Sequence, residues 1–418
     1  VDRCDYRYQK KPFRCTAMPR DDIQRRSVGA IMDQWPQDGI LSLACGKGKT
    51  IVSIMAAAQF QLPVFVVVPT GIVMGGWVAE LIGDTKTNTT PKTTLTKKDI
   101  GIIQGDDIRW DGYPVTLCML NTLAFRSDEW SEEMRRYPGL IIYDECHRLG
   151  ATQFSRASTI FYGPRLGLTA TLTRPDRMDF VFRYQLGEVI YRNVEQDLQP
   201  SYTFMRTPTR IPSFQKELVI DATGQVNTSL VNSWLSRQMH RNALIINEIK
   251  KMRKYGRNIL ILSHIRDHVE ILRAMLGYGE VIHGGIKPES ERRRRLFSSD
   301  VTFATLQLVK EGTNKPELDT LFLVTPSGGE EDPTRTSITF PQASGRICRI
   351  REGKKKPLVL VLEDHLISAC SRQLLKMKQE IRNRGDSYDL DRQAFPPPKV
   401  VQEMVRKMEQ ELPDLSHR

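Results

Sequence analysis

Residues 41–56, LSLACGKGKTIVSIMA, decide the fold of this chain. The apolar run 40–44 predicts a short buried strand, and the apolar residues after position 50 predict the start of a helix. The turn between them holds five residues in a row: Gly46, Lys47, Gly48, Lys49 and Thr50. A strand, a turn with glycines and a helix, in this order, are the context of a phosphate-binding loop. Its glycines let backbone N–H groups approach phosphate oxygens, and the N-terminus of the helix attracts their negative charge.

The side chains of this turn suit a nucleoside triphosphate with its metal ion. Lys49 can reach the β- and γ-phosphates, and the Thr50 hydroxyl can hold Mg²⁺. The strict phosphate-loop pattern is incomplete, because Leu43 stands where the first glycine would be, but the GxGKT core is present. We therefore predict ATP and Mg²⁺ as cofactors. The alternative is a surface loop that is rich in glycine and lysine and binds no ligand.

The composition is that of a globular protein with an excess of basic residues. The 418 residues are 40% hydrophobic and 26% charged, and the formal net charge of +12 favours a polyanionic partner. The length predicts two or three domains. No apolar run reaches the roughly 18 residues of a membrane span, and the first residues lack the apolar core of a secretory signal. Seven scattered cysteines without a CxxC pair argue against a zinc site and suit a reducing compartment.

The first half of the chain alternates predicted strands and helices, as in an α/β domain. Helices are expected over 21–35, which Pro36 ends, and over 76–82. The Thr/Lys-rich segment 83–99 is predicted to be a solvated loop. Further strands are expected at 64–68, 100–103, 115–120, 140–143 and 166–171.

Two carboxylates follow the buried strand 140–143 directly. They are Asp144 and Glu145, the first residues of the run DECH. The carboxyl ends of parallel strands are where open α/β sheets bind ligands. At this place Asp144 can hold Mg²⁺, and Glu145 can orient and polarise an attacking water. The next strand ends in Thr169 and Thr171, which form either an ordinary strand end or a link between the nucleotide and a nucleic-acid track.

The alternation of predicted strands and helices ends near residue 195 and resumes after residue 228. Residues 199–228 contain Pro200, Pro208 and Pro212 and are expected to connect two domains. A single long helix is predicted over 229–255, and the run Lys354, Lys355 and Lys356 is expected in a solvated turn. Further strands are expected at 258–262, 280–282, 301–305, 321–325 and 357–362, and further helices at 267–276, 289–298, 368–384 and 400–411.

Two groups of arginines in the second half suit phosphate binding. The run SGRICR contains Arg346 and Arg349, and a second domain can bring such a pair across a cleft to a γ-phosphate, where planar guanidinium groups stabilise developing charge. The alternative is a surface helix that carries two arginines. The second group is the run 292–295, RRRR. At most two of its members share one face of a helix, so a DNA contact and a solvated surface are weighed equally.

In their order along the chain, these runs resemble the motifs of the superfamily 2 helicases and translocases. The resemblance covers about residues 20–365. The matching runs are ACGKGKT (44–50), VVVPTGIVMGGW (66–77), LNTL (120–123), DECH (144–147), TAT (169–171), ILILSHIRDHVEIL (259–272), FATLQLVKEGTN (303–314) and QASGRICR (342–349). The run LGLTATLTRPDRMD (166–179) and the helix with Arg241 and Asn242 are similar to the branch that holds Rad25-type repair helicases, phage branch-migration helicases and restriction-enzyme motor subunits.

The resemblance implies an α/β fold of two tandem RecA-like P-loop domains, with parallel sheets and ATP in the cleft between them. It implies catalytic roles for Lys49, Asp144, Glu145, Arg346 and Arg349, and metal binding by Thr50 and Asp144. The nucleotide-binding residues that it implies are Gln24, Gly46, Lys47, Gly48, Lys49, Thr50, Gly312 and Gln342, with Gln24 at the adenine edge. The nucleic-acid contacts that it implies are Pro69, Thr70, Asn121, Thr122, Ser263, His283, Gly284 and Thr305.

The resulting prediction is an ATP-dependent DNA helicase or translocase that unwinds or branch-migrates DNA in recombination, repair or replication. Its domains are expected at 1–198 and 229–395, joined by the linker 199–228 and followed by a helical extension at 396–418. We expect a monomer that does not bind membranes and acts in the cytoplasm of a bacterial or phage-infected cell. Its expected partner is single-stranded or branched DNA, with RNA as the alternative. A nuclear or viral setting is the alternative. The competing functions are an RNA helicase, a double-strand DNA translocase of a restriction-type complex, and a nucleic-acid-binding module with a decayed ATPase. The retained Lys49, Asp144 and Glu145 argue against the last.

Overall fold

The computed structural model divides into two compact units, Val1–Gln196 and Asp197–Arg418. The structure describes residues 10–44, 46–85, 89–172, 178–193, 198–287, 289–306, 315–325, 340–349, 351–383, 388–390, 402–403 and 405–406.

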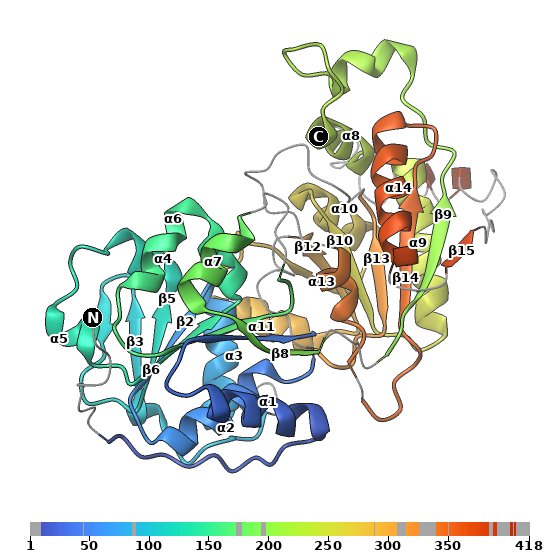
Figure 1. Cartoon of the computed structure of the whole chain (residues 1–418). Helices are drawn as coiled ribbons and strands as arrows, with labels where there is room; N and C mark the ends of the chain where they lie inside the picture. Colours follow the sequence, from blue (N-terminus) through green and yellow to red (C-terminus); the bar gives the residue numbers. More distant parts are fainter. Residues whose placement is uncertain are drawn as a thin grey trace. The chain divides into compact units, whose positions relative to one another are not determined.

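The first unit is built on one eight-stranded sheet (Figure 1). The strand order is β4-β3-β5-β2-β6-β7-β1-β8, and only β3 and β4 pair in antiparallel fashion. The strands are β1 (Gly39–Leu43), β2 (Val64–Val68), β3 (Ile100–Gln104), β4 (Asp107–Arg109), β5 (Val115–Met119), β6 (Leu140–Asp144), β7 (Arg165–Thr169) and β8 (Val189–Asn193).

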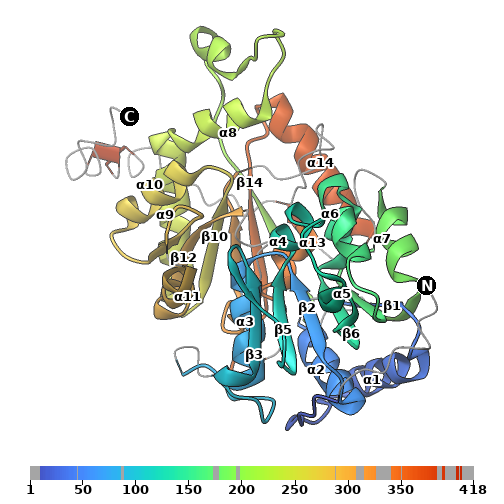
Figure 2. The same ribbon diagram turned by 90° about the vertical axis from the view of Figure 1, so that its left-hand side faces the viewer.

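Both faces of this sheet are covered, which explains why its central strands are apolar along their whole length. Leu140 and Ile142 of β6 face one apolar cluster, whereas Ile141 and Tyr143 face another on the opposite side. The first cluster includes residues of α1 (Asp22–Gln34), α2 (Lys49–Phe60) and α3 (Gly71–Ile82), and the second includes residues of α4 (Leu120–Phe125), α5 (Glu132–Arg136) and α7 (Asp179–Leu186) (Figure 2). The short helix α6 (Thr152–Ser155) lies between the last two of these in the chain.

Two expectations for the first unit were wrong. The helix that we expected to begin at residue 76 begins at Gly71, because the Thr70 hydroxyl accepts a hydrogen bond from Val73 N and caps it. The segment 83–99 is not simply solvated: the buried Thr93 donates its hydroxyl to the Leu81 carbonyl at 2.7 Å, and Leu95 is buried as well.

The second unit contains a seven-stranded sheet in which all neighbours are parallel. The order is β11-β12-β10-β13-β14-β9-β15. The strands are β9 (Ser201–Arg206), β10 (Ile259–Ser263), β11 (Glu280–Ile282), β12 (Val301–Thr305), β13 (Thr320–Leu323), β14 (Leu358–Glu363) and β15 (Tyr388–Leu390). The helices of this unit are α8 (Thr228–Ser236), α9 (Met239–Lys254), α10 (Arg266–Leu276), α11 (Glu289–Ser298), α13 (Phe340–Gly345) and α14 (Ser368–Asn383).

The segment 199–228 is only in part a connection. Ser201–Arg206 forms strand β9, which pairs in parallel with Leu358–Glu363 inside the second sheet. The prolines at positions 200 and 208 flank this strand and do not interrupt it, and its Tyr202 and Phe204 are fully buried. The second sheet therefore begins well before the long helical segment.

The helix predicted over 229–255 is two helices, α8 and α9. Gln238 between them has an extended backbone, with φ −78° and ψ 99°. The Asn242 side chain donates from Nδ2 to the Ser236 carbonyl at 2.8 Å, which satisfies an acceptor at the end of α8. The apolar pattern continues through this break, so it does not reveal the change of direction.

Lys354 was expected in a solvated turn and is half-buried instead. Its Nζ donates to the carbonyl oxygens of Pro316 and Arg349, at 2.9 Å and 2.8 Å. Burial lowers the pKa of Lys354 to about 8.

Some of the predictions concern residues outside those that the structure describes. Most of the helix predicted at 400–411 lies there, as do Cys4 and Cys45. The remaining cysteines are free thiols: Cys15, Cys118, Cys146, Cys348 and Cys370. Within the described part of the chain, no helix has the length and apolar character needed to cross a membrane.

Candidate functional site

The glycine turn after β1 forms an open loop at the start of α2. Gly46 and Gly48 have φ values of 90° and 86°, a region that favours glycine. Helix α2 begins at Lys49, and its first backbone N–H groups have no side-chain cap from Gly48. Uncapped N–H groups at a helix N-terminus suit a phosphate group.

Gln24 of α1 supports this loop. The side chain is 3% exposed, its Nε2 donates to the Lys47 carbonyl at 3.1 Å, and its Oε1 accepts from Arg20 N at 2.8 Å. A Cβ atom at position 48 would overlap Gln24 Nε2, so the glycine there lets the two segments approach closely. Both ends of the Gln24 amide are thus engaged by backbone groups, and contact with an adenine edge stays a prediction.

Lys49 lies in the same loop with its ammonium turned back to the backbone. Its Nζ donates to the Leu43 carbonyl at 3.1 Å. Thr50 follows it in the first turn of α2, and Lys47 is buried. The loop follows β1 and Asp144 ends β6, so Lys49 and the Asp144 carboxylate lie at the same edge of the sheet.

Asp144 ends β6 and receives a hydrogen bond on each of its carboxylate oxygens. Glu145 N donates to Oδ1 at 2.9 Å, and Trp77 Nε1 donates to Oδ2 at 2.9 Å. Burial and, after it, the charge of Glu145 raise the pKa of Asp144 to about 6, against the opposing effects of the Trp77 bond and Lys49. The ionised carboxylate is therefore costly at this position and gains from a cation.

Glu145 lies beside His147, which contacts the strand end at Thr169. Its backbone is left-handed, with φ 50°, an uncommon conformation for a residue with a side chain. His147 Nδ1 lies 3.4 Å from Glu145 Oε2 and 3.1 Å from Thr169 Oγ1. Since the Thr169 hydroxyl donates to the Thr171 carbonyl at 2.7 Å, its oxygen accepts from His147, which assigns the Nδ1–H tautomer.

The donor set fits Mg²⁺ held together with a nucleotide. Mg²⁺ is commonly bound by one or two protein oxygens plus phosphate oxygens and waters. Asp144 and Thr50 are donors of this kind. Among the described residues there is no group of three or more His, Cys, Asp or Glu side chains that could hold a metal ion without a phosphate.

The predicted arginines of the second unit follow α13. Arg346 is 8% exposed, and Arg349 is partly buried, so the alternative of a plain surface helix does not describe them. Gly312 lies outside the described residues, and the side chain of Gln342 is not described either. Of the four consecutive arginines, Arg294 and Arg295 form ion pairs with Glu291 of their own helix, at 2.7 Å and 2.8 Å.

The nucleic-acid contacts predicted in the first unit lie after neighbouring strands. Pro69 and Thr70 follow β2, and Asn121 and Thr122 follow β5, which pairs with β2. Asn121 is exposed, whereas Thr122 is buried and its hydroxyl accepts from Gly105 N at 2.9 Å. Thr122 therefore supports the turn between β3 and β4, and Asn121 is the better placed to meet a ligand.

The contacts predicted in the second unit also share one sheet edge. Ser263 ends β10, His283 follows β11, and Thr305 ends β12, three strands that are adjacent in the sheet. All three side chains are buried, and Gly284 is exposed. His283 Nε2 lies 2.9 Å from Glu270 Oε1, and Gly285 N donates to its Nδ1 at 3.1 Å.

Behind this edge lies a buried polar network that our sequence analysis missed. Arg241 Nε and Nη2 bind the two oxygens of Asp364 at 2.9 Å and 2.8 Å, and Thr207 donates to the same carboxylate. Asn242 and Ser263 flank the ring of His268, each at 3.0 Å, and burial lowers the pKa of His268. Arg241 and Asn242, which stand directly before the apolar residues 243–246, are the signal that could have indicated it.

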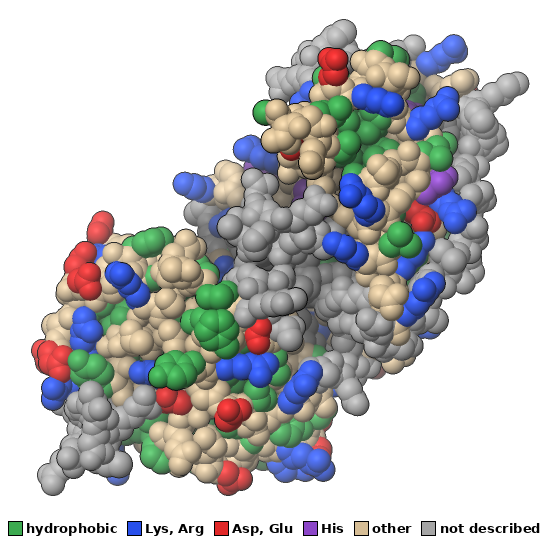
Figure 3. Space-filling model, turned by 45° about the horizontal axis from the view of Figure 1, so that its top comes forward, with side chains coloured by type: hydrophobic (Ala, Val, Ile, Leu, Met, Phe, Trp, Pro, Cys, Tyr) green, Lys and Arg blue, Asp and Glu red, His purple; other side chains and the backbone are tan. Residues whose placement is uncertain are grey.

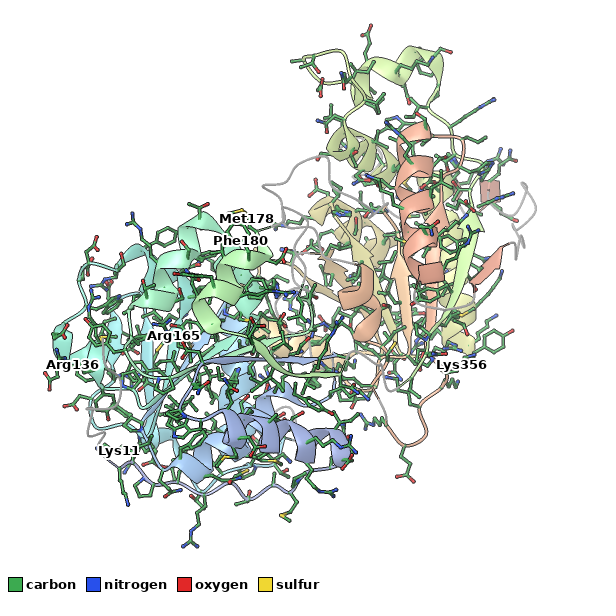
Figure 4. The ribbon with its side chains drawn as sticks, viewed as in Figure 1. Lys11, Arg136, Arg165, Met178, Phe180 and Lys356 are labelled. Atoms are coloured by element: carbon green, nitrogen blue, oxygen red, sulfur yellow. The ribbon has the colours of Figure 1, made fainter. Side chains whose placement is uncertain are left out.

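The basic residues are dispersed. Figure 3 shows Lys and Arg side chains scattered over the visible face of both units, with Asp and Glu more frequent on the first. Lys11 and Arg136 lie at the periphery of the first unit and Lys356 at that of the second (Figure 4). The net charge of +12 is thus not gathered in one patch on that face.

Each of the two α/β units has a sheet whose strands are largely or wholly parallel. In the first unit, a glycine loop and strand-end carboxylates lie at one edge of the sheet. These features define a nucleotide-binding protein of RecA-like fold. A solved structure with a similar fold is described as S. cerevisiae Dbp5 bound to RNA and ADP BeF3. It is 12% identical and has a TM-score of 0.59, with 92% of this chain and 93% of that chain covered. This likeness concerns the fold alone.

The sequence comparisons find relatives among the helicases. A family model described as "Type III restriction enzyme, res subunit" matches residues 15–174. The "Putative ATP-dependent RNA helicase L396" of Acanthamoeba polyphaga mimivirus is 25% identical over 374 residues, which cover 87% of this chain and 67% of the relative. The "DNA 3'-5' helicase XPB" of Mycobacterium tuberculosis is 32% identical over 142 residues, or 33% of this chain and 24% of the relative. These matches support the resemblance to the DEAD/DEAH-like helicases of superfamily 2 that the motifs indicated.

Proposed function

We propose that this chain is an ATP-dependent DNA helicase or translocase that unwinds or branch-migrates DNA. The observation that carries the proposal is the assembly of Lys49, Asp144 and Glu145 at one sheet edge, where Glu145 N and Trp77 Nε1 bind the Asp144 carboxylate. The similarity to helicases supports the use of ATP, and the choice of DNA as the substrate rests on the two features given below.

In this proposal, residues of the first unit have separate roles in ATP hydrolysis. Backbone N–H groups of the loop at Gly46 and Gly48 bind phosphate oxygens, and Lys49 leaves the Leu43 carbonyl to bind the terminal phosphates. Thr50 and Asp144 hold Mg²⁺, which neutralises charge on the phosphates when it is bound. Glu145 accepts the proton of the attacking water.

The second unit contributes Arg346 and Arg349. In this proposal the two guanidinium groups reach the γ-phosphate when nucleotide is bound and stabilise the charge of the transition state. The strand-end residues of both units, Asn121 and Gly284 among them, bind the nucleic-acid backbone. Such contacts are independent of sequence and weaken with salt.

Two features favour DNA as the substrate. The relative with the highest identity reported above is named a DNA helicase, and its match covers a third of the chain. The run LGLTATLTRPDRMD resembles a branch of DNA motors. RNA is the second candidate, because the mimivirus relative, which matches over most of the chain, carries the name of an RNA helicase. That relative also makes an infected cell a plausible setting for the protein.

Phosphate release in the presence of different nucleic acids tests the substrate. The matched set is one sequence as single-stranded DNA, duplex DNA, a four-way DNA junction and single-stranded RNA, each with the full chain and with Glu145→Gln. We expect the DNA species, and the junction most of all, to stimulate hydrolysis. Stimulation by RNA alone would contradict the DNA proposal and leave the helicase assignment intact.

A further inference from the structure

Trp77 of α3 reaches the end of a strand that lies 67 residues further along the chain. Its indole Nε1 donates to Asp144 Oδ2 at 2.9 Å, and the side chain is only 2% exposed. The ring packs in the apolar cluster beneath α1, α2 and α3, so its position is fixed by the core of the first unit. The N–H group is therefore held rigidly against a carboxylate that the proposed function assigns to Mg²⁺.

The choice of acceptor distinguishes Trp77 from other buried tryptophans in the chain. Trp130 Nε1 donates to the Leu123 carbonyl at 3.3 Å, and Trp234 Nε1 donates to Gln215 Oε1 at 2.8 Å. Both of those bonds satisfy a buried donor with a neutral group outside the candidate site. The bond from Trp77 goes to an ionisable oxygen, and hydrogen bonds to charged groups are the stronger ones.

The geometry around Asp144 shows what the bond does. An ionised carboxylate has about four lone-pair positions. Glu145 N occupies one on Oδ1 and Trp77 Nε1 occupies one on Oδ2, so the carboxylate plane is fixed from both sides. The remaining positions then point in defined directions. Without the indole N–H, the bond from Glu145 N alone holds the carboxylate plane, and Oδ2 loses its fixed direction.

We propose that Trp77 is a positioning residue of the ATPase, which orients the Asp144 carboxylate for the metal ion. The proposal rests on the proposed function, because it takes Asp144 as a metal ligand. Outer-shell partners of this kind typically change metal affinity by about 10–100-fold when they are removed. Since Trp77 lies on the helix that begins at Gly71, next to the predicted nucleic-acid contacts Pro69 and Thr70, it also joins that helix to the metal site.

The test is metal binding by the full chain, measured without catalysis. Mn²⁺ is titrated against the protein with saturating ADP, and metal bound to the protein is measured in electron paramagnetic resonance from the loss of the free Mn²⁺ signal beyond the loss that the same ADP causes alone. Trp77→Phe keeps most of the ring and removes the N–H donor, and Trp130→Phe does the same at a buried tryptophan outside the site. We expect the half-saturating Mn²⁺ concentration to rise about 10–100-fold in Trp77→Phe and to stay unchanged in Trp130→Phe.

Three results have distinct meanings. An unchanged Mn²⁺ titration in Trp77→Phe, with normal binding by the wild-type chain, would overturn the positioning role. An equal loss in Trp130→Phe would also overturn it, because the effect would then belong to general core packing. Failure of the wild-type chain to bind Mn²⁺ with ADP would instead refute the metal site and the proposed function.

A second measurement needs no stable Trp77 variant. The chain has five tryptophans, and 5-fluorotryptophan gives each a fluorine resonance. Paramagnetic Mn²⁺ broadens resonances of nearby nuclei, so Mn²⁺ with ADP should broaden one resonance far more than the other four. Equal broadening of all five, in a chain that binds Mn²⁺, would place Trp77 away from the metal and contradict the proposal.

Discussion

At the scale of single residues, the shape of the phosphate loop depends on the absence of a side chain at Gly48. Gly48 has φ 86°, and a Cβ at its position would overlap the amide of Gln24. The glycine signal was visible in the sequence, since GxGKT is a local pattern. The contact from Gln24 to Lys47 was not visible, because it depends on how α1 packs on the loop.

Gly48→Ala should therefore damage the loop more than an ordinary glycine substitution. We expect ADP affinity to fall at least ~10-fold, because backbone strain of about 1–3 kcal/mol adds to the overlap with Gln24. Isothermal titration calorimetry measures the affinity. Gly29→Ala is the matched control, since no atom lies within 4 Å of its Cβ position in α1, and it should bind ADP normally. Equal affinity in both variants would contradict this account of the loop.

Asp144 gives the first unit a pH-dependent stability. Its pKa in the folded chain is raised to about 6 from the ordinary 3.8, so the folded state binds a proton more tightly than the unfolded state. The wild-type chain should lose stability relative to Asp144→Asn as the pH rises from about 4 through about 6. Thermal melting in EDTA at several pH values measures this difference. A difference that is independent of pH would show that burial does not perturb Asp144.

At the scale of elements, the break between α8 and α9 depends on one side chain. Asn242 donates to the Ser236 carbonyl and its Oδ1 lies 3.0 Å from His268 Nε2, with every partner inside the second unit. The apolar periodicity of residues 229–255 runs through the break, so the sequence predicted one helix. Apolar spacing indicates which face is buried and says nothing of a side chain that replaces a backbone hydrogen bond.

Asn242→Ala should destabilise the second unit without touching the ATP loop. It leaves two buried groups without this partner, and each such loss costs about 1–3 kcal/mol. We expect the free energy of unfolding to fall by about 2–6 kcal/mol in urea denaturation. Asn227→Ala removes the N-cap of α8 and should cost only about 1 kcal/mol. If the two variants lose the same stability, the buried network does not have the role described here.

At the scale of the whole molecule, the chain contains one largely parallel and one wholly parallel sheet. No local sequence pattern reveals the order of their strands. The sequence analysis found two α/β halves, because apolar runs alternate with helical patterns throughout. It missed β9 as a strand of the second sheet, since its partner β14 begins at Leu358, far along the chain. It also missed the bond from Trp77 to Asp144, which exists only because α3 packs across the sheet.

The division of the ATPase between the two units can be tested at Arg346. Arg346→Ala should lower ATP hydrolysis by ~10³–10⁵-fold, the usual effect of losing an arginine finger, and leave ATP binding intact. Phosphate release measures the first property and calorimetry with ATP the second. Arg294→Ala is the control, because its guanidinium pairs with Glu291 in its own helix. Equal loss of binding and hydrolysis would argue against a role in the transition state.

The central claim is that the carboxylate edge of the first unit hydrolyses ATP, and single-turnover phosphate release tests it most directly. The measurement compares the wild-type chain with Glu145→Gln and with Glu132→Gln, whose carboxylate pairs with Arg136 on the surface. The account predicts that Glu145→Gln binds ATP normally and hydrolyses it about 10²–10⁴-fold more slowly, and that Glu132→Gln behaves as wild type. Hydrolysis by Glu145→Gln at the wild-type rate would contradict the account.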